Sequence, residues 1–383
     1  MRFAINAHLV AFSGTYRQAG VSKYTELLIN SLAALDSQDE FIIYTAPGQR
    51  PPEFAAAPNF TVKASRLPTI KPPVRIGWEQ FLAPPILLRD HPALLHCPVN
   101  VVPLAAPCPT VLTIHDLGFL RFPERYKWAK RTYLTTATRL SAKRAAHIIT
   151  DAEAIRQEVI ELLKISPDKV TAIPLAADSR FKPAEAEKVA AFRREKNLPE
   201  RFIIYVGTLE PRKNIPLLLK GFARLRRDSP AAVAGVGLVL GGAKGWLYEE
   251  IFRLIRELGL EESVQFPGYI ADADLPLWYN SAEVMVYPSI YEGFGFPPLE
   301  AMACGTPVIT SNTSSLPEVV GEAGLTVSPD DEPGMAEALR RVLTEPELRA
   351  ELRQKGLAQA ARFSYRETAR QTLEVYRKVA VRG

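Results

Sequence analysis

Short β-rich runs alternate with helical patterns in two successive sets along this chain of 383 residues, and that alternation restricts the fold more than any other feature. The first set of strand-like runs is Phe3–Ala7, Phe41–Tyr44, Leu94–Cys97, Thr110–Ile114, His147–Thr150 and Val170–Ile173. The second set is Phe202–Val206, Gly237–Leu240, Ser263–Phe266, Val284–Tyr287, Val308–Thr310 and Leu325–Val327. Strands that alternate with helices form parallel sheets with both faces covered. The sequence therefore predicts an α/β protein with two doubly wound, Rossmann-like domains facing a cleft.

The length also favours two domains, because single hydrophobic cores stop growing at roughly 250–300 residues. The segment Ala176–Pro183 separates the two sets of strands and reads as a linker. We place the domains at residues 1–180 and 181–364, followed by a terminal helix at residues 365–383. A further helix is predicted after Thr150, since Thr150 and Glu153 have the spacing of a capping box.

Two glutamates flank the turn that follows the strand Val284–Tyr287. Glu292 and Glu300 are separated by Gly-Phe-Gly-Phe-Pro-Pro-Leu, and the two prolines fit only the first turn of a helix, where no amide donor is needed. The free N–H groups at such a helix start favour an anion such as a diphosphate. Each ionised carboxylate can accept hydrogen bonds from a vicinal diol. The element predicts a sugar-nucleotide site, and two solvated glutamates on a surface helix are the simpler alternative.

This Glu, seven residues, Glu element resembles that of the retaining glycosyltransferases of family 4, which have the GT-B fold, and the resemblance extends over nearly the whole chain. It implies that Glu292 approaches the transferred sugar and that Glu300 holds the nucleotide ribose. It also implies an acceptor-binding first domain, a second domain that binds the nucleotide sugar, and a last helix that crosses back to the first domain. The further donor-binding residues that it implies are Gly293, Phe294, Gly295 and Phe296.

A second group of candidates follows the strand Phe202–Val206, where the chain reads Gly-Thr-Leu-Glu-Pro-Arg-Lys-Asn. Members of the family usually place two cations here that bind the diphosphate, and Lys213 is the direct match. Thr208 stands where many relatives have an arginine, so Arg212 is the nearest candidate for the second cation. Ordinary surface residues are the alternative, but cations at a helix start oppose the helix dipole, which favours a functional use.

His115 follows the strand Thr110–Ile114, at the end of the strand where ligands bind in such sheets. The resemblance implies that this histidine donates a hydrogen bond to a hydroxyl of the transferred sugar, while Asp116 fixes its orientation or the loop. A lone histidine is more often structural than catalytic, but its place at a strand end favours the functional interpretation.

Two glycine-containing segments complete the candidate site. Gly14 and Gly20 bracket a loop before the helix at Val21, and the family has a glycine loop here that closes over the diphosphate. An ordinary surface loop is the alternative. Gly268 and Tyr269 follow another strand and resemble the segment whose backbone reads the base.

No metal and no organic cofactor are expected, and the donor substrate is predicted to be a GDP-sugar or UDP-sugar. Lys213, Arg212 and the helix start at Pro297 would neutralise the departing diphosphate. The only Asp-x-Asp, Asp272 to Asp274, precedes a helix, where an aspartate is more often a cap than a metal ligand. No carboxylate is placed by motif for a double displacement, which favours same-face attack. A nicotinamide oxidoreductase is excluded, because no Gly-x-Gly-x-x-Gly follows the first strand.

Positive charge is concentrated in the first 180 residues, which carry 21 Lys and Arg against 15 Asp and Glu, whereas the remaining residues carry 26 against 27. The densest stretch, residues 121–144, interleaves basic and aromatic side chains at helical spacing. It predicts either a solvated basic face or attraction to anionic lipid or a phosphate-bearing acceptor. We expect no nucleic-acid partner.

The sequence favours a cytoplasmic protein. No stretch approaches 18 uninterrupted apolar residues, and the N-terminus reads as a strand and not as a signal peptide. Cys97, Cys108 and Cys304 form no metal-type or redox pair, which suits a reducing compartment. Peripheral contact with the inner face of a membrane is the open alternative to a protein that stays in solution.

The leading hypothesis is a retaining, metal-independent glycosyltransferase that moves a hexose from a nucleoside-diphosphate sugar to a glycan, lipid-linked or small-molecule acceptor. The two motifs look most like those of mannosyltransferases of polysaccharide assembly, which favours GDP-mannose. The alternatives are an enzyme that uses UDP-glucose or UDP-N-acetylglucosamine, a UDP-sugar 2-epimerase of the same architecture, and a binding protein without catalysis. Intact Glu292, Glu300 and Lys213 argue against the last.

Overall fold

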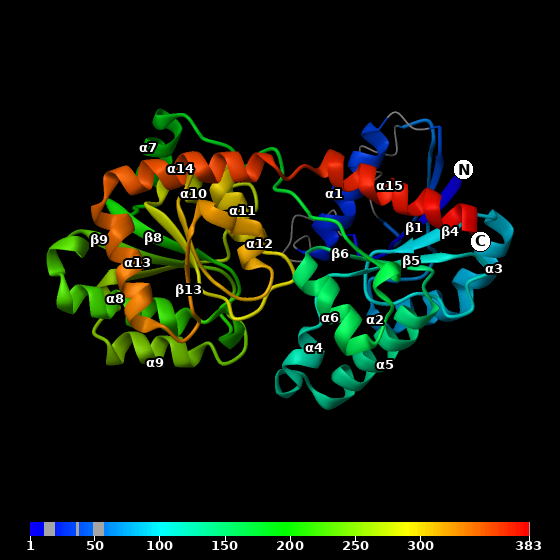
Figure 1. Ribbon diagram of the computed structural model, residues 1–383, viewed down its shortest axis with the longest axis horizontal. Helices are drawn as coiled ribbons and strands as arrows, with labels where there is room; N and C mark the ends of the chain where they lie inside the picture. Colours follow the sequence, from blue (N-terminus) through cyan, green and yellow to red (C-terminus); the bar gives the residue numbers. More distant parts are fainter. Residues whose placement is uncertain (11–19, 36–37, 49–56, 383) are drawn as a thin grey trace. The chain divides into compact units, whose positions relative to one another are not determined.

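The chain divides into two units, and the residues of the second interrupt the sequence of the first. A computed structural model describes residues 1–10, 20–35, 38–48 and 57–382. Unit 1 consists of Met1–Leu175 and Ser364–Gly383, and unit 2 is Ala176–Phe363. Each unit has its own parallel sheet. The prediction of an α/β protein with two Rossmann-like domains is confirmed (Figure 1).

The sheet of unit 1 has the strand order β3-β2-β1-β4-β5-β6-β7 within the described residues. Every pair of neighbours is parallel. The strands are β1 Arg2–Ala7, β2 Glu40–Thr45, β3 Phe60–Ala64, β4 Leu94–Cys97, β5 Thr110–Ile114, β6 His147–Thr150 and β7 Val170–Ala172. Six of them were predicted, and β3 was missed. This edge strand is only partly buried, so it lacks the continuous apolar run that marks the central strands.

Helices cover both faces of this sheet, with α1 and α15 together on one face and α5 and α6 on the other (Figure 1). The α-helices are α1 Val21–Ala34, α2 Pro72–Gly77, α3 Ala83–Asp90, α4 Gly118–Arg121, α5 Trp128–Arg144, α6 Glu153–Leu163 and α15 Tyr365–Arg382. A π-helical segment, η3 Trp78–Leu82, joins α2 to α3. Two short 3₁₀ turns are η4 Pro123–Arg125 and η5 Pro167–Lys169.

Helix α15 is the last element of the chain and part of the core of unit 1. Tyr376 is fully buried, with its ring centroid 5.3 Å from that of Phe3, and its hydroxyl is hydrogen-bonded to His96. Arg377 Nη2 lies 2.8 Å from Asp39 Oδ2. The helix therefore closes the sheet face that β1 and β4 present.

The sheet of unit 2 has the strand order β10-β9-β8-β11-β12-β13 and is also parallel throughout. Its strands are β8 Arg201–Val206, β9 Val236–Gly241, β10 Val264–Gly268, β11 Val284–Tyr287, β12 Val308–Ser311 and β13 Leu325–Val327. Its α-helices are α7 Ala186–Glu195, α8 Ile215–Asp228, α9 Glu249–Glu257, α10 Leu275–Ser281, α11 Phe296–Ala303, α12 Leu316–Val320, α13 Glu332–Thr344 and α14 Pro346–Ala361. The 3₁₀ turns are η6 Pro211–Lys213, η7 Pro230–Val233, η8 Glu261–Ser263 and η9 Gly321–Ala323.

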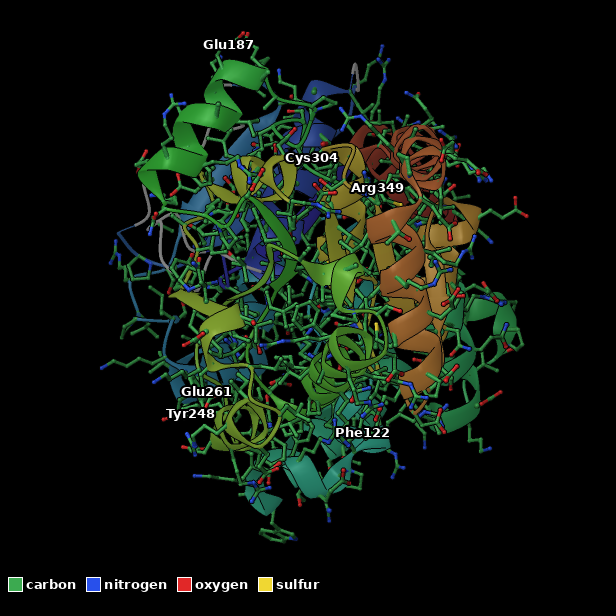
Figure 2. All side chains as sticks on the ribbon, turned by 90° about the vertical axis from the view of Figure 1, so that its left-hand side faces the viewer. Phe122, Glu187, Tyr248, Glu261, Cys304 and Arg349 are labelled. Carbon is green, nitrogen blue, oxygen red and sulfur yellow. The ribbon has the colours of Figure 1, made fainter. Side chains whose placement is uncertain are left out.

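Mainly apolar side chains fill the interior of each unit, and a few charged side chains are buried among them. The three cysteines are free and buried, and Cys304 lies inside unit 2, whereas Glu187 on α7 points outward into solvent (Figure 2). No helix of the described residues combines the length and the apolar character that crossing a membrane requires.

Each sheet has one point at which the strand order reverses. In unit 1 the chain runs one way from β1 to β2 and β3, and the other way from β4 onward, so the reversal lies between β1 and β4. In unit 2 it lies between β8 and β11. Ligands of doubly wound sheets bind beyond the carboxyl ends of strands at this point, which directs attention to the residues that follow these four strands.

Candidate active site

A lysine and a glutamate meet at the reversal point of unit 2. Lys213 ends η6, which follows β8, and Glu292 lies just beyond β11. Lys213 Nζ donates hydrogen bonds to Glu292 Oε1 and to the Tyr287 hydroxyl, each at 2.6 Å. Lys213 is 7% exposed and Glu292 is 8% exposed. Two charged groups are therefore held together in a buried place where a parallel sheet is expected to bind its ligand.

Arg212 binds the other oxygen of the same carboxylate. Its Nη1 lies 3.2 Å from Glu292 Oε2 and donates to the Tyr291 carbonyl at 2.6 Å. Its Nη2 lies 3.0 Å from Glu210 Oε1. Glu292 thus bridges the two cations that the sequence assigned to the diphosphate.

The electrostatics of the cluster depend on burial and on this pairing. Burial alone would raise the pKa of Glu292, but the charges of Lys213 and Arg212 outweigh it and hold that pKa below its ordinary value. Burial lowers the pKa of Lys213 although Glu292 opposes the change. The carboxylate is therefore ionised at neutral pH and compensates cations that an incoming diphosphate could bind instead.

Serines hold the backbone and carboxylate of Glu292 in place. Ser289 Oγ donates to Glu292 Oε1. Ser314 Oγ donates to the Glu292 carbonyl at 2.6 Å, and Ser315 Oγ donates to the Phe294 carbonyl at 2.7 Å. Ser314 and Ser315 follow β12, the neighbour of β11, and sequence reasoning missed all three. Serine is common in loops, so only their positions after strand ends could have indicated them.

Glu300 lies further along, in α11. Its Oε2 accepts a hydrogen bond from the Tyr279 hydroxyl at 3.2 Å. Burial, with a smaller contribution from the nearby charge of Asp272, raises its pKa to about 7. Because Glu300 is half-buried and pairs with no cation within 4 Å among the described residues, its second oxygen is suited to a hydroxyl ligand.

The turn between the two glutamates has the predicted form. Helix α11 begins at Phe296 with two prolines in its first turn, and Gly295 precedes it at φ 117°, a conformation that favours glycine. A Cβ at Gly295 would also lie 2.8 Å from Leu316 Cδ2. Gly293 and Phe296 are half-buried.

The side chain of Phe294 points into the interior of unit 2. Its ring is 5% exposed and packs edge-on against Phe296 and Phe363, with centroids 5.6 and 5.9 Å away. The ring belongs to the core, because an aromatic side chain between apolar neighbours is most stable when shielded from water. Only the backbone of Phe294 is left for a ligand.

The remaining donor candidates of unit 2 lie at the carboxyl ends of β8 and β10. Thr208 is exposed, and Tyr269 is 52% exposed. The Gly242 amide donates to the Gly268 carbonyl at 2.8 Å. A Cβ at Gly242 would lie 1.9 Å from the Gly207 carbonyl oxygen, so this close approach of two loops requires glycine.

His115, in unit 1, has both ring nitrogens engaged. Nε2 donates to the Pro98 carbonyl at 2.8 Å, and Nδ1 lies 2.6 Å from Asp151 Oδ2. A carbonyl can only accept, so Nε2 carries a proton, and the carboxylate favours a second one on Nδ1. Burial lowers the pKa of His115, but Asp151 outweighs it and raises the pKa above its ordinary value. Donation to a sugar hydroxyl would require Nε2 to leave Pro98.

Asp151, and not Asp116, orients His115. Asp116 has the second of the two roles predicted for it, that of fixing the loop. Asp116 Oδ1 accepts from the Gly118 amide at 2.9 Å and so fixes the loop. The capping box expected around Asp151 is wrong. The N-cap of α6 is Ala152, without a side-chain capping bond, and Thr150 Oγ1 donates to the Ala152 carbonyl instead.

Of the two loop glycines, Gly14 lies outside the described residues. Gly20 is exposed and precedes α1 with φ 62°. The glycine-loop assignment therefore stays a prediction.

The Asp-x-Asp pair faces cations. Asp272 Oδ2 lies 2.5 Å from Arg180 Nη2, and Asp274 Oδ2 lies 3.8 Å from Lys196 Nζ. Asp274 directly precedes α10, as predicted, although its side chain makes no capping bond. Within the described part of the chain, no three His, Cys, Asp or Glu side chains form a group that could hold a metal ion.

Both units match known protein families. Residues 188–359 match the model described as "Glycosyl transferases group 1", and residues 19–181 match the model described as "Glycosyltransferase Family 4". These ranges correspond to much of unit 2 and of unit 1.

Two curated relatives are mannosyltransferases of Escherichia coli. O-antigen chain mannosyltransferase B is 35% identical over 268 residues, which is 70% of each chain. Serotype-specific mannosyltransferase WbdA is 34% identical over 281 residues, 71% of this chain but 34% of its own. The chain thus spans about a third of WbdA.

Solved structures with the same architecture cover almost the entire chain. Sucrose-phosphate synthase from Thermosynechococcus elongatus aligns with a TM-score of 0.76 at 22% identity over 100% of both chains. HepE of Anabaena, in complex with UDP-glucose, aligns with a TM-score of 0.73 at 18% identity over 99% of this chain and 100% of its own. At this identity the likeness establishes the fold, which is the GT-B fold of two Rossmann-like domains.

Proposed function

The chain belongs to the glycosyl transferases of group 1, within glycosyltransferase family 4, and on that premise we propose that it transfers mannose from GDP-mannose with retention of configuration and without a metal ion. The observation that carries the proposal is the cluster of Lys213, Arg212 and Glu292 at the reversal point of unit 2. It combines two cations suited to a diphosphate with a carboxylate suited to sugar hydroxyls.

The choice of mannose is supported by the relatives. The E. coli proteins that match over about 70% of the chain are named as mannosyltransferases. A UDP-sugar is the second candidate donor, because the solved structure of HepE holds UDP-glucose in the same architecture. Backbone groups read the base in this proposal, and the exposed Tyr269 borders that segment.

In the proposed resting state Glu292 and Glu210 together neutralise Lys213 and Arg212. When the donor binds, its diphosphate becomes the partner of the two cations, and the Glu292 carboxylate accepts hydrogen bonds from the sugar. Glu300 accepts hydrogen bonds from the ribose diol. Charge-assisted hydrogen bonds of this kind contribute about 1.5–3 kcal/mol each.

The chemical step breaks the bond between the anomeric carbon and the diphosphate oxygen and forms a bond from that carbon to the acceptor hydroxyl on the same face. The departing phosphate accepts the proton of that hydroxyl, so no further base is needed. Lys213 and Arg212 stabilise the negative charge that develops on the leaving group, which is the larger electrostatic demand of the reaction. In unit 1, His115 is the candidate donor to a sugar hydroxyl, and this role would require Nε2 to leave Pro98.

Metal independence is part of the proposal. Two cations already face the place assigned to the diphosphate, whereas Asp272 and Asp274 are directed toward Arg180 and Lys196. A diphosphate held by protein cations has no need of a divalent ion to balance its charge.

We also propose a glycan or lipid-linked acceptor and peripheral contact of unit 1 with an anionic membrane. Helix α5 contains no acidic residue, and its first residue, Trp128, is 74% exposed. Exposed aromatic and cationic side chains on one helix favour an anionic interface.

A screen of donors tests the central proposal. Thermal unfolding is followed with GDP-mannose, UDP-glucose and UDP-N-acetylglucosamine, since a ligand at about 100 times its Kd stabilises by about 2.7 kcal/mol. We expect the largest shift with GDP-mannose, and release of mannose or its transfer without epimerised product. An epimerised product would instead support a UDP-sugar 2-epimerase, and no shift with any donor would contradict the proposal.

A further inference from the structure

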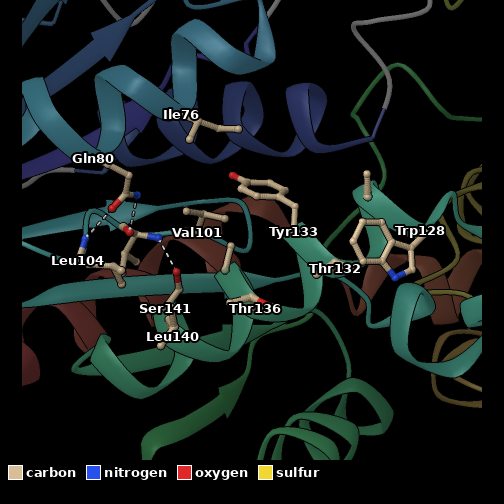
Figure 3. A pocket seen from close by; sticks show the side chains of 13 residues that line it. Ile76, Gln80, Val101, Leu104, Trp128, Thr132, Tyr133, Thr136, Leu140 and Ser141 are labelled. Carbon is tan, nitrogen blue, oxygen red and sulfur yellow. Dashed lines mark hydrogen bonds between the residues drawn. The ribbon is translucent and has the colours of Figure 1, made fainter.

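An apolar pocket of about 530 Å³ lies along α5 in unit 1 (Figure 3). One wall is a continuous face of α5 from Trp128 through Thr132, Thr136 and Leu140. The facing wall comes from α2 and η3 and from the loop after β4, including Ile76 and Val101. Its volume is within the range of small-molecule sites, about 300–1,000 Å³.

Two polar side chains in the wall, Gln80 and Ser141, are already used within the protein. Gln80 donates to the Val102 carbonyl and accepts from the Leu104 amide, each at 3.1 Å, and Ser141 Oγ accepts from the Val102 amide at 3.0 Å (Figure 3). A polar ligand would lose its own hydration without gaining these partners. The pocket therefore favours an apolar occupant.

The dimensions favour a single hydrocarbon chain. From Trp128 to Ser141 the lining face of α5 extends for about 20 Å at 1.5 Å per residue. The pocket therefore runs lengthwise along α5 as an elongated apolar slot. Such a slot is suited to one alkyl or isoprenyl chain.

Positive charge without acidic partners accompanies the pocket. Lys127, Lys130 and Arg131 lie at the Trp128 end of α5, and in the described part of the chain none of them has a carboxylate within 4 Å. The crossover from β5 to β6 runs antiparallel to the strands, so this end of α5 lies at the carboxyl edge of the sheet, the edge that carries His115. An amphiphile whose chain occupies the pocket would place its charged head there.

We infer that this pocket binds the hydrocarbon chain of a lipid-linked acceptor, with the acceptor's phosphate or diphosphate at Lys127, Lys130 and Arg131. The inference rests on the proposed function, because it names the class of acceptor that the transferase uses. It goes beyond attraction to a charged membrane surface, since it assigns one chain to one pocket.

The test is a series of monomeric n-alkyl phosphates, from hexyl to dodecyl, titrated below their micelle concentrations with the full-length protein. Calorimetry measures binding. A buried methylene contributes about 0.8 kcal/mol, so affinity should rise about fourfold per methylene until the pocket is full. The matching n-alkyl alcohols should bind more weakly at low salt and lose that difference at high salt.

Two threonine-to-tryptophan substitutions distinguish an effect on the pocket from an effect on the rest of α5. Thr136→Trp fills the pocket and should weaken decyl phosphate binding at least about tenfold, whereas Thr135→Trp, outside the lining, should leave it unchanged. Circular dichroism checks that both variants fold. Affinity that is independent of chain length, or equal losses in both variants, would overturn the inference.

Two further measurements distinguish the inference from binding of bulk membrane lipid and from the proposed function of unit 2. If Thr136→Trp weakens binding to phosphatidylglycerol vesicles as much as binding to decyl phosphate, the pocket takes membrane lipid and the inference is wrong. GDP binding by the parent protein tests the function of unit 2 independently. If the parent protein does not bind GDP, the proposed function is contradicted. The chain-length series alone decides whether the pocket binds a hydrocarbon chain.

Discussion

Lys213 Nζ lies 2.6 Å from Glu292 Oε1, a contact that joins the segments following β8 and β11, two neighbouring strands of unit 2. Removing one partner of a buried pair is costly, because the other charge remains buried without compensation. Here Arg212 also holds Glu292, so the carboxylate keeps a counter-ion when Lys213 is changed. The two cations can therefore be tested one at a time.

Lys213→Ala should reduce turnover about 10²–10³-fold, because the lysine is assigned to the charge that develops as the phosphate departs. Donor affinity should change less than turnover. Steady-state kinetics with the preferred donor measure both. Lys220→Ala, which removes an exposed cation from α8 of the same unit, is the control and should behave as the parent. Turnover within a few-fold of the parent would transfer the phosphate role to Arg212.

Glu300→Ala should weaken GDP binding by about 1.5–3 kcal/mol, because the ribose diol loses its acceptor. Calorimetry on the folded variant measures the change. Glu322→Ala removes an exposed glutamate elsewhere in unit 2 and serves as the control. Unchanged nucleotide affinity in Glu300→Ala would contradict the assignment of Glu300 as the acceptor for the ribose hydroxyls.

GDP affinity should rise as the pH increases from 6 to 8, because Glu300 has a pKa of about 7 and only its ionised form accepts from both ribose hydroxyls. For a group with that pKa the ionised fraction grows about tenfold over this interval, which sets the upper limit of the effect. Glu300→Gln should flatten the dependence. Equal slopes in parent and variant would assign the pH effect to the nucleotide itself.

The raised pKa of Glu300 also makes the stability of the folded protein depend on pH. A carboxyl whose pKa is raised above its ordinary 4.5 stabilises the folded state fully below that value, and this contribution is lost as the pH rises through about 7. Chemical denaturation of the parent and of Glu300→Gln should therefore diverge between pH 5 and 8, with the parent losing more stability. Parallel curves would contradict the raised pKa.

Activity should survive excess EDTA, because the cations of unit 2 are assigned to the diphosphate and the Asp272 and Asp274 carboxylates face Arg180 and Lys196. Transfer is assayed before and after dialysis against the chelator. Complete loss that Mg²⁺ or Mn²⁺ restores would falsify metal independence.

Unit 1 should bind anionic vesicles in a salt-dependent manner through α5. Co-sedimentation with phosphatidylglycerol vesicles should decrease steeply from low to physiological ionic strength, as expected for exposed charges. A Lys127/Lys130/Arg131 triple alanine variant should bind less. If the parent ignores the vesicles at low salt, or the variant binds them equally, the basic stretch is a solvated face or an acceptor site.

Much of the fold follows from the sequence, because buried parallel strands require continuous apolar runs. All the predicted strands are present, and the edge strand β3 was missed because one side of it faces solvent. Lys213 and Glu292 were assigned by family motif, and Arg212 by its proximity to Lys213. The structure explains why these residues meet, since β8 and β11 are neighbours in the sheet.

 Lys213 and Glu292 themselves are 79 positions apart in sequence, and it is the pairing of β8 with β11 that brings them together.

The parts that sequence reasoning missed depend on contacts between distant segments. Asp151 directly follows β6 and lies between Thr150 and Glu153, the two residues interpreted as a capping box. It binds His115, 36 positions earlier, because β5 and β6 are neighbours. The serines that support Glu292 come from the ends of β11 and β12 in the same way. Phe294 was assigned to the donor because it lies inside the motif, but the position of Phe363 places its ring in the core. Local patterns identify strand ends, whereas only the strand order reveals which ends meet.

The place of α15 has a consequence for how the protein is made. Translation proceeds from the first residue to the last, so all of unit 2 leaves the ribosome before Tyr376, the side chain that packs against Phe3 and His96. Unit 2 is continuous in sequence and can complete its core during synthesis, whereas unit 1 cannot complete its core until α15 has been synthesised. A proteolytic cut in the short segment before Tyr365 would therefore separate α15 from the rest of unit 1, the unit that contains the first residue. Damage near one end of the polypeptide would thus weaken the unit that begins at the other end.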